Sequence, residues 1–179
     1  PISVVMNYYR HIDRSKVQFD FLIDSDSSLV PREEIESLGG RVFEIPPYQH
    51  VLAYQRELHR LFIQEGWKIV HSHINALSVF PLRAAKKAGV PVRIAHSHST
   101  SGKGEYAKNA LKAVLKTQSN RYPTHRFACS RFAGDWLFGP SSQFVVMRNA
   151  IDLSLFAPDV EDRLKTRRSL GVADDQLLV

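Results

Sequence analysis

Residues 68–98, KIVHSHINALSVFPLRAAKKAGVPVRIAHSH, decide the fold of this chain. Two apolar runs, residues 68–71 and 92–96, each stop at two histidines that are separated by a single residue. Between them, residues 76–88 are rich in residues that favour helices, and Gly89 follows where a helix would end. Strand, helix and strand in this order form a βαβ unit, whose two strands run parallel.

The same alternation continues along most of the chain. Further strands are predicted over residues 18–23, 41–45, 125–129 and 144–147, and further helices from Ile2 and over residues 31–38, 51–64, 105–121 and 131–138. Alternation of this length is typical of a parallel sheet with helices on both faces. The sequence therefore predicts an α/β fold with a doubly wound parallel sheet.

The chain changes character near its end. With 179 residues it can form one domain with a full core, and residues 1–157 are expected to make up that domain. Pro158-Asp159 interrupts the pattern, residues 161–170 predict a charged helix, and residues 177–179 predict the beginning of a strand. We therefore expect residues 158–179 to be a linker helix and the first strand of a following domain.

Composition limits the classes of partner. The 24 basic and 18 acidic residues give a net charge of +6. This charge favours anionic partners such as nucleotide phosphates, acidic lipid headgroups or nucleic acid, with a solvated basic surface as the alternative. No apolar run approaches the roughly 20 residues that span a bilayer. Cys129 is the single cysteine, so no internal disulfide can form, which is typical of a reducing cytoplasm.

The two His-x-His pairs are the first candidates for a site. Residues i and i+2 of a strand point to the same face, so each pair is expected to present two imidazoles side by side. Ligands bind beyond the carboxyl ends of the strands in open α/β sheets. The imidazoles could hold a metal ion, contact a sugar or phosphate, or individually hydrogen-bond the backbone as core histidines. A catalytic metal would also need carboxylates, and only Asp24 and Asp26 stand near another strand end, so we expect no metal.

A small polar loop and a basic helix follow the second histidine pair. Residues 99–104 lack the glycine spacing of a Walker loop, and we expect them to form a mobile loop over the site. Lys108, Lys112 and Lys116 recur every four residues, which places them on one face of a helix. This basic stripe predicts either contact with an anionic membrane or a solvated outer face. Nucleic acid is not expected, because aromatic residues are not interleaved with the lysines.

Several segments resemble retaining glycosyltransferases of family four, and most closely their bacterial capsule and exopolysaccharide branch. The resemblance is carried by Ile69–His73, Ile94–His98, Phe127–Ser130, Ala133–Gly139 and Val145–Leu153, together with Phe156 and Pro158. Its most specific part is the run Asn-Ala-Ile-Asp at residues 149–152, with Phe156 four positions further on. The resemblance covers essentially the whole chain.

The resemblance implies a GT-B architecture, in which two Rossmann-like domains face each other across a cleft. This chain would be the N-terminal, acceptor-side domain without its first strand and glycine-rich loop, and residues 158–179 would begin the donor domain. The implied reaction transfers a sugar from a UDP- or GDP-sugar, with retention and without metal or cofactor, to a surface polysaccharide or lipid-linked acceptor. We expect the fragment alone to be inactive, and the protein to be cytoplasmic with peripheral contact to the inner membrane face.

The resemblance also assigns roles to particular residues. Its active-site histidine, which would hydrogen-bond the transferred sugar, falls on His96 or His98, and the register leaves both open. Assigned to the acceptor side are His73, Asn75, Ser99 and Lys103, and assigned to the hinge of the cleft are Asn149 and Asp152.

Three alternatives stand beside the transferase. A nucleotide-sugar 2-epimerase shares the same two-domain fold, but the motif from Asn149 to Phe156 argues against it. A non-catalytic ligand-binding module is the second. A metal-dependent hydrolase is the third, and the shortage of carboxylates at the strand ends argues against it.

Overall fold

The structure, a computed structural model, describes residues 2–98, 106–154, 156–173 and 175–177, and the side chains of residues 106–110 lie outside that description. The chain divides into two compact units, Pro1–Asn149 and Ala150–Val179. Each unit is therefore considered by itself.

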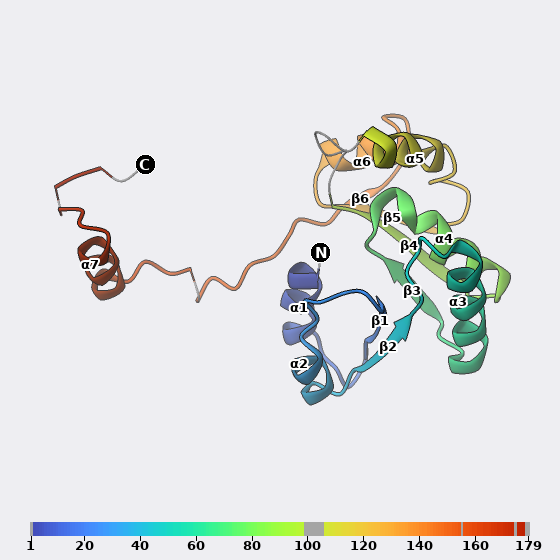
Figure 1. The fold of residues 1–179 in the computed structure, drawn as a ribbon, viewed down its shortest axis with the longest axis horizontal. Helices are drawn as coiled ribbons and strands as arrows, with labels where there is room; N and C mark the ends of the chain where they lie inside the picture. Colours follow the sequence, from blue (N-terminus) through green and yellow to red (C-terminus); the bar gives the residue numbers. More distant parts are fainter. Residues whose placement is uncertain (1, 99–105, 155, 174, 178–179) are drawn as a thin grey trace. The chain divides into compact units, whose positions relative to one another are not determined.

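All strand pairing within the described residues is parallel, in two sheets (Figure 1). The first sheet pairs β1 (Asp20–Asp24) with β2 (Arg41–Ile45). The second has the order β3 (Ile69–Ser72), β4 (Val92–Ser97), β5 (His125–Ala128) and β6 (Val145–Val146). The predicted α/β fold with parallel strands is confirmed, although the strands form two sheets where one was expected.

Helices alternate with these strands. In the first unit they are α1 (Ile2–His11), α2 (Arg32–Ser37), α3 (Val51–Glu65), α4 (Val79–Lys87), α5 (Tyr106–Lys116) and α6 (Arg131–Phe138), and a 3₁₀ turn, η1 (Asn75–Ser78), leads into α4. Ser130 caps α6 as its position predicts, because its Oγ accepts a hydrogen bond from the backbone N–H of Ala133 at 3.1 Å.

Helix α3 provides a core that both sheets share. Its buried face carries Leu58, Leu61 and Phe62, as the predicted helix pattern requires. Phe43 of β2 and Val70 of β3 pack against the same cluster. The indole N–H of Trp67, just before β3, donates to Asp20 Oδ2 at 2.7 Å, which adds a polar link between the two sheets. The shared core therefore fixes the position of β3, at whose end the first histidine pair begins.

A separate hydrophobic cluster joins α1 and α2 to β1. Met6, Tyr9 and Ile35 are almost fully buried there against Phe21. Gly40 comes directly before β2 and lies beside this cluster. A Cβ atom at Gly40 would lie 2.8 Å from the backbone oxygen of Phe19. The close approach of the chain at this point therefore requires glycine.

Two predicted elements are shorter than expected. Helix α5 ends at Lys116 and not at residue 121, because Thr117 Oγ1 donates to Val114 O at 2.7 Å, a local bond that competes with further helix. The strand predicted over residues 144–147 pairs only at Val145 and Val146. Among the described residues, none of the helices combines the length and apolar character that a membrane span requires.

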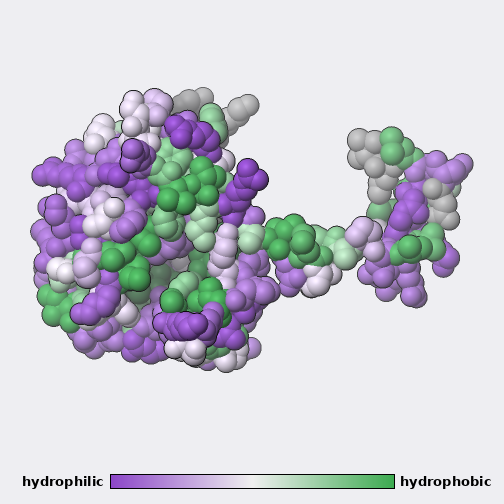
Figure 2. Space-filling view, turned by 180° about the vertical axis from the view of Figure 1, so that it is seen from behind, coloured by the Kyte–Doolittle hydropathy of each residue, from purple (hydrophilic) through white to green (hydrophobic). Residues whose placement is uncertain are grey.

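The second unit contains α7 (Val160–Ser169), which Asp159 caps by accepting from Asp162 N. Arg167 is buried and donates to the backbone oxygens of Ala173 and Gln176. Leu177 is not in a strand, and residues 178–179, where that strand was predicted to continue, lie outside the described residues. Ile151, Leu153 and Phe156 have exposed apolar side chains, and Figure 2 shows hydrophobic surface on the chain that leads to α7.

Candidate functional site

The two histidine pairs lie on neighbouring strands. β3 pairs with β4 so that Ser72 is opposite Ala95, and β4 pairs with β5 so that His96 is opposite Phe127. Because side chains alternate between the two faces of a strand, this register brings the histidines of both strands to one face of the sheet. The parallel register, which the sequence alone does not give, therefore turns two separate pairs into one group.

The opposite face of the same strand ends carries small residues that pack under helices. Ser72 Oγ donates to Ser78 Oγ at 2.9 Å, and Ser97 Oγ donates to the backbone oxygen of Ala133 at 2.9 Å. Both bonds are buried, and each ties a strand end to the element that follows it or packs on it. These contacts hold the strands that carry the histidines.

His71, His73, His96 and His98 form what we call the four-histidine cluster. His71 Nε2 lies 3.1 Å from His96 Nδ1, and His73 Nδ1 lies 2.8 Å from His98 Nε2. Within each pair the ring centroids are 4.0 Å and 4.1 Å apart, which confirms the predicted side-by-side arrangement. Among the described residues, two hydrogen bonds link these imidazoles to one another, so they are not isolated core histidines bonded to the backbone.

Burial lowers the pKa of all four imidazoles below the ordinary value of 6.5. Burial and the neighbouring His98 lower the pKa of His71 to about 4, and burial with the adjacent imidazoles lowers the pKa of His96 to about 3. The pKa of His98 is also lowered by burial, against the effect of a side-chain hydrogen bond with Asn149. At neutral pH each ring is uncharged and offers one donor and one acceptor nitrogen.

Asn75 has a structural role in addition to the predicted place on the acceptor side. It adopts a positive φ of 51°, which is uncommon for a residue with a side chain, although asparagine tolerates it better than most. Its Oδ1 accepts a hydrogen bond of 2.7 Å from the backbone N–H of His98. The end of β3 is thereby joined to the end of β4, and Asn75 fixes the backbone that carries His98.

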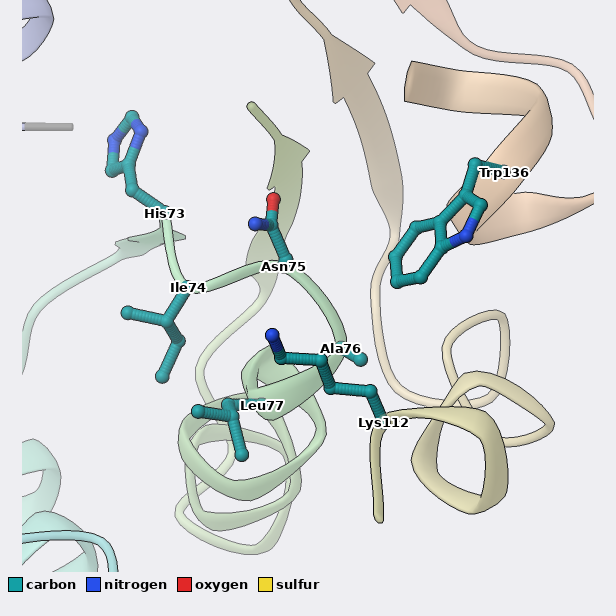
Figure 3. A pocket seen from close by; sticks show the side chains of 7 residues that line it. All are labelled: His73, Ile74, Asn75, Ala76, Leu77, Lys112 and Trp136. Atoms are coloured by element: carbon teal, nitrogen blue, oxygen red, sulfur yellow. The ribbon is translucent and has the colours of Figure 1, made fainter. Parts of the chain in front are cut away.

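A pocket of about 230 Å³ lies beside the cluster and is lined by His73, Ile74, Asn75, Ala76, Leu77, Lys112 and Trp136. Figure 3 shows Asn75 between His73 and Trp136, with the Lys112 side chain extending toward Asn75. The pocket therefore combines an imidazole, an amide, an ammonium group and an aromatic ring. Lys112 and Trp136 were not predicted as site residues, because they come from α5 and α6 and meet only in the folded chain.

The basic stripe on α5 does not face solvent in the way the sequence suggested. Lys112 is half-buried at the pocket, and the half-buried Lys116 places its Nζ 5.1 Å from the centroid of the Trp136 ring. By contrast, the large apolar side chains of Leu111 and Val114 on the same helix are exposed. Lysine stems pack readily on apolar and aromatic surface, which accounts for the inward orientation. The side chain of Lys108 lies outside the described residues.

The remaining predicted site residues have different outcomes. Asn149 lies close enough to His98 for its side chain to raise the pKa of that imidazole against the effect of burial. Ser99 and Lys103 lie outside the described residues. Asp152 belongs to the second unit, where its Oδ1 accepts from Ser154 N and Ser154 Oγ at 3.0 Å and 2.6 Å.

Carboxylates do not join the histidines in the part of the chain that is described. The candidate metal-ligand group there consists of His71, His73 and His96. Asp24, at the end of β1, has a raised pKa because of burial and the nearby charge of Asp26. Cys129 has its Sγ 3.3 Å from the backbone oxygen of His98, to which it donates.

Comparison with known proteins identifies the family of this chain. Residues 1–150 match the family model described as "Glycosyl transferase 4-like domain", and the chain therefore belongs to that family. This membership confirms the resemblance to family-four glycosyltransferases and agrees with the Rossmann-like half of a GT-B fold.

A relative supports the same assignment. The "Putative glycosyltransferase EpsF" of Bacillus subtilis (strain 168) is 38% identical over 186 residues. The alignment covers 99% of this chain and 48% of the relative, so the chain spans about half the length of the curated relative it matches.

Proposed function

We propose that this chain is the acceptor-side half of a retaining glycosyltransferase, which transfers a sugar from a UDP- or GDP-sugar to a surface polysaccharide or a lipid-linked acceptor. The observation that carries the proposal is the four-histidine cluster beside a pocket in a chain of the glycosyl transferase 4-like family. The polysaccharide acceptor rests on the sequence resemblance to the capsule and exopolysaccharide branch.

The neutral state of the cluster supports contact with sugar. Uncharged imidazoles donate to and accept from hydroxyl groups, and they help to disperse the positive charge that develops on a sugar during transfer. A phosphate would instead need a cation, and Lys112 provides one in the pocket. The Trp136 ring adds an aromatic wall of the kind that small-molecule sites use.

Burial distinguishes the two candidates for the active-site histidine. His96 keeps only 2% of its surface exposed and lies against His71, whereas His98 is half-buried. We infer that His98 touches the transferred sugar and that His96 is a positioning residue in the same cluster. The effect of the Asn149 side chain on the pKa of His98 is consistent with a site near the end of the first unit.

Membrane contact belongs to this proposal as well. The exposed Leu111 and Val114 form an apolar surface on α5, and apolar helix surfaces of this kind can lie at a lipid interface. A cytoplasmic enzyme that uses a lipid-linked acceptor would meet its substrate there. In this proposal the contact is made by the leucine and valine, while Lys112 and Lys116 face the pocket and Trp136.

The experiment is a transfer assay on the full-length protein with a panel of UDP- and GDP-sugars, followed by mass spectrometry. We expect turnover of one donor and a loss of about 100-fold or more in kcat/KM for His98→Ala, the size of a lost transition-state contact. His96→Ala should lower kcat/KM less, and the exposed His50→Ala is the matched control.

Three other results would contradict the proposal in distinct ways. If no nucleotide sugar is bound or turned over, the chain is not part of a transferase. If the donor sugar is epimerised at C2 without an acceptor, the 2-epimerase is correct. If transfer occurs and neither His96→Ala nor His98→Ala affects it, the cluster is not the site.

A further inference from the structure

The four-histidine cluster contains ring nitrogens that could bind a further ligand. His71, His73 and His96 each offer a ring nitrogen, and the three atoms all lie within 4.8 Å of one another. The Nε2 atom of His96 is buried and has no hydrogen-bond partner among the described residues, on a side chain that is 2% exposed. Buried polar atoms are rarely left without a partner, so this nitrogen points to a ligand.

We propose that His71, His73 and His96 bind one divalent transition-metal ion of the zinc, nickel or copper class. Zinc–nitrogen bonds of about 2.0–2.1 Å place the ligand atoms of a tetrahedral site about 3.4 Å apart. The three candidate ligand nitrogens lie within 4.8 Å of one another, so the rings would have to approach one another by at most about 1.4 Å to enclose an ion.

The donor set decides which ions fit. Imidazole nitrogen suits zinc, copper and nickel, whereas magnesium and calcium take oxygen ligands, which this group lacks within the described residues. Neutral imidazole is the form that coordinates a metal, and burial lowers the pKa of all three histidines. At neutral pH no proton has to leave a charged ring before the ion binds.

The rings are also held in place before any ion arrives. His71 and His96 stand on adjacent parallel strands, and the Phe127 ring contacts both edge-on, with centroids 5.6 Å and 5.9 Å away at 86°. A site on paired strands keeps its geometry better than one on a loop. This proposal departs from the metal-free protein that the resemblance implies.

A bound ion would also regulate the proposed reaction, a consequence that rests on the proposed function. Coordination would occupy His73, which lines the pocket on the proposed acceptor side, and would move the ring of His96, which positions His98. The ion should therefore inhibit transfer, and a chelator should restore it.

The direct test uses full-length protein freed of metal by a chelator. Calorimetric titration with Zn²⁺ should give one ion per chain, and Co²⁺ should develop the intense visible absorption of a four-coordinate site. Mg²⁺ should give no binding heat. Loss of an outer-shell partner already weakens metal binding about 10–100-fold, so the loss of a direct ligand in His71→Gln should weaken Zn²⁺ binding by at least about 100-fold. His50 is exposed and distant in sequence from the cluster, so His50→Ala should leave Zn²⁺ binding unchanged.

The metal site is refuted if the wild type shows no saturable Zn²⁺ binding. It is also refuted if His71→Gln binds Zn²⁺ as tightly as the wild type does. If His71→Gln does not fold, imidazole NMR of the wild type decides the question. One equivalent of Zn²⁺ should then shift the ring resonances of His71, His73 and His96, and shifts confined to other histidines refute the proposal. Because none of these measurements needs turnover, the metal site and the transferase proposal can fail independently.

Discussion

Acidification should destabilise this protein in a pH window that the four-histidine cluster sets. A buried imidazole with a lowered pKa stays neutral in the folded protein at pH values at which the same imidazole is protonated in the unfolded chain, where its pKa is about 6.5. The free energy of unfolding therefore falls as the pH drops below 6.5, and it keeps falling until the folded pKa is reached. For His71 and His96 those folded pKa values are about 4 and about 3.

The magnitude follows from the size of this window. One pKa unit corresponds to about 1.4 kcal/mol, so between pH 7.5 and pH 5 each of these two histidines should remove about 2 kcal/mol of stability. Their sum of about 4 kcal/mol is a large part of the 5–15 kcal/mol that stabilises a typical domain. Carboxylates with lowered pKa values, such as Asp20 and Glu34, lose their contribution to the free energy of unfolding only at lower pH, so they do not account for a loss of stability between pH 7.5 and pH 5.

The assay is urea denaturation of the full-length protein at pH 7.5 and pH 5, followed by circular dichroism, with EDTA present to keep metal out. In His71→Gln the loss of stability between the two pH values should be smaller than in the wild type by about 2 kcal/mol, because one titrating ring is gone. His50 is exposed, so His50→Ala should show the same loss of stability between pH 7.5 and pH 5 as the wild type. Equal losses in the wild type and in His71→Gln would refute the argument that burial keeps the cluster neutral.

Two further predictions concern the backbone around the site. Gly134→Ala should lower the free energy of unfolding by about 1–3 kcal/mol in urea denaturation, because the new Cβ would lie 2.1 Å from Phe144 Cε2 and the ring must move. The double variant with Phe144→Leu should recover part of this loss. An unchanged urea midpoint for Gly134→Ala would contradict the close packing. Asn75→Ala should lower the free energy of unfolding by about 1–3 kcal/mol, through strain at φ 51° and the lost hydrogen bond to His98 N. Asn75→Gly should lower it less, because glycine tolerates that φ. Equal losses in the two variants would refute the strain argument.

Local rules were enough to predict the elements and the side-by-side histidines. The alternation of side chains along a strand places His71 beside His73 whatever the rest of the fold does. The buried face of α3 and the Ser130 cap follow from helical period and from the hydrogen bonds that a helix start leaves open. Each of these features depends on residues within a few positions of one another.

Features that depend on contacts between distant residues were not predictable in this way. The pairing of His71 with His96, 25 positions along the chain, needs the register of β3 against β4. The inward orientation of Lys112 and Lys116 needs Trp136 of α6 as a partner surface. A helical period shows that two residues share a face, but it does not show which face the protein covers.

The neutral state of the cluster is the physical condition that the sugar site and the metal site have in common. Burial keeps the rings uncharged, and an uncharged ring has a lone pair that either a sugar hydroxyl or a metal ion can use. The proposed metal ligands include His73 of the pocket and His96 beside His98, so a bound ion should oppose transfer, and an assay with trace metal present would understate it. Acid stability in the presence of EDTA should be measured before either ligand is tested, because a cluster that takes up protons near pH 6.5 would lose both ligands as soon as the pH falls below that value.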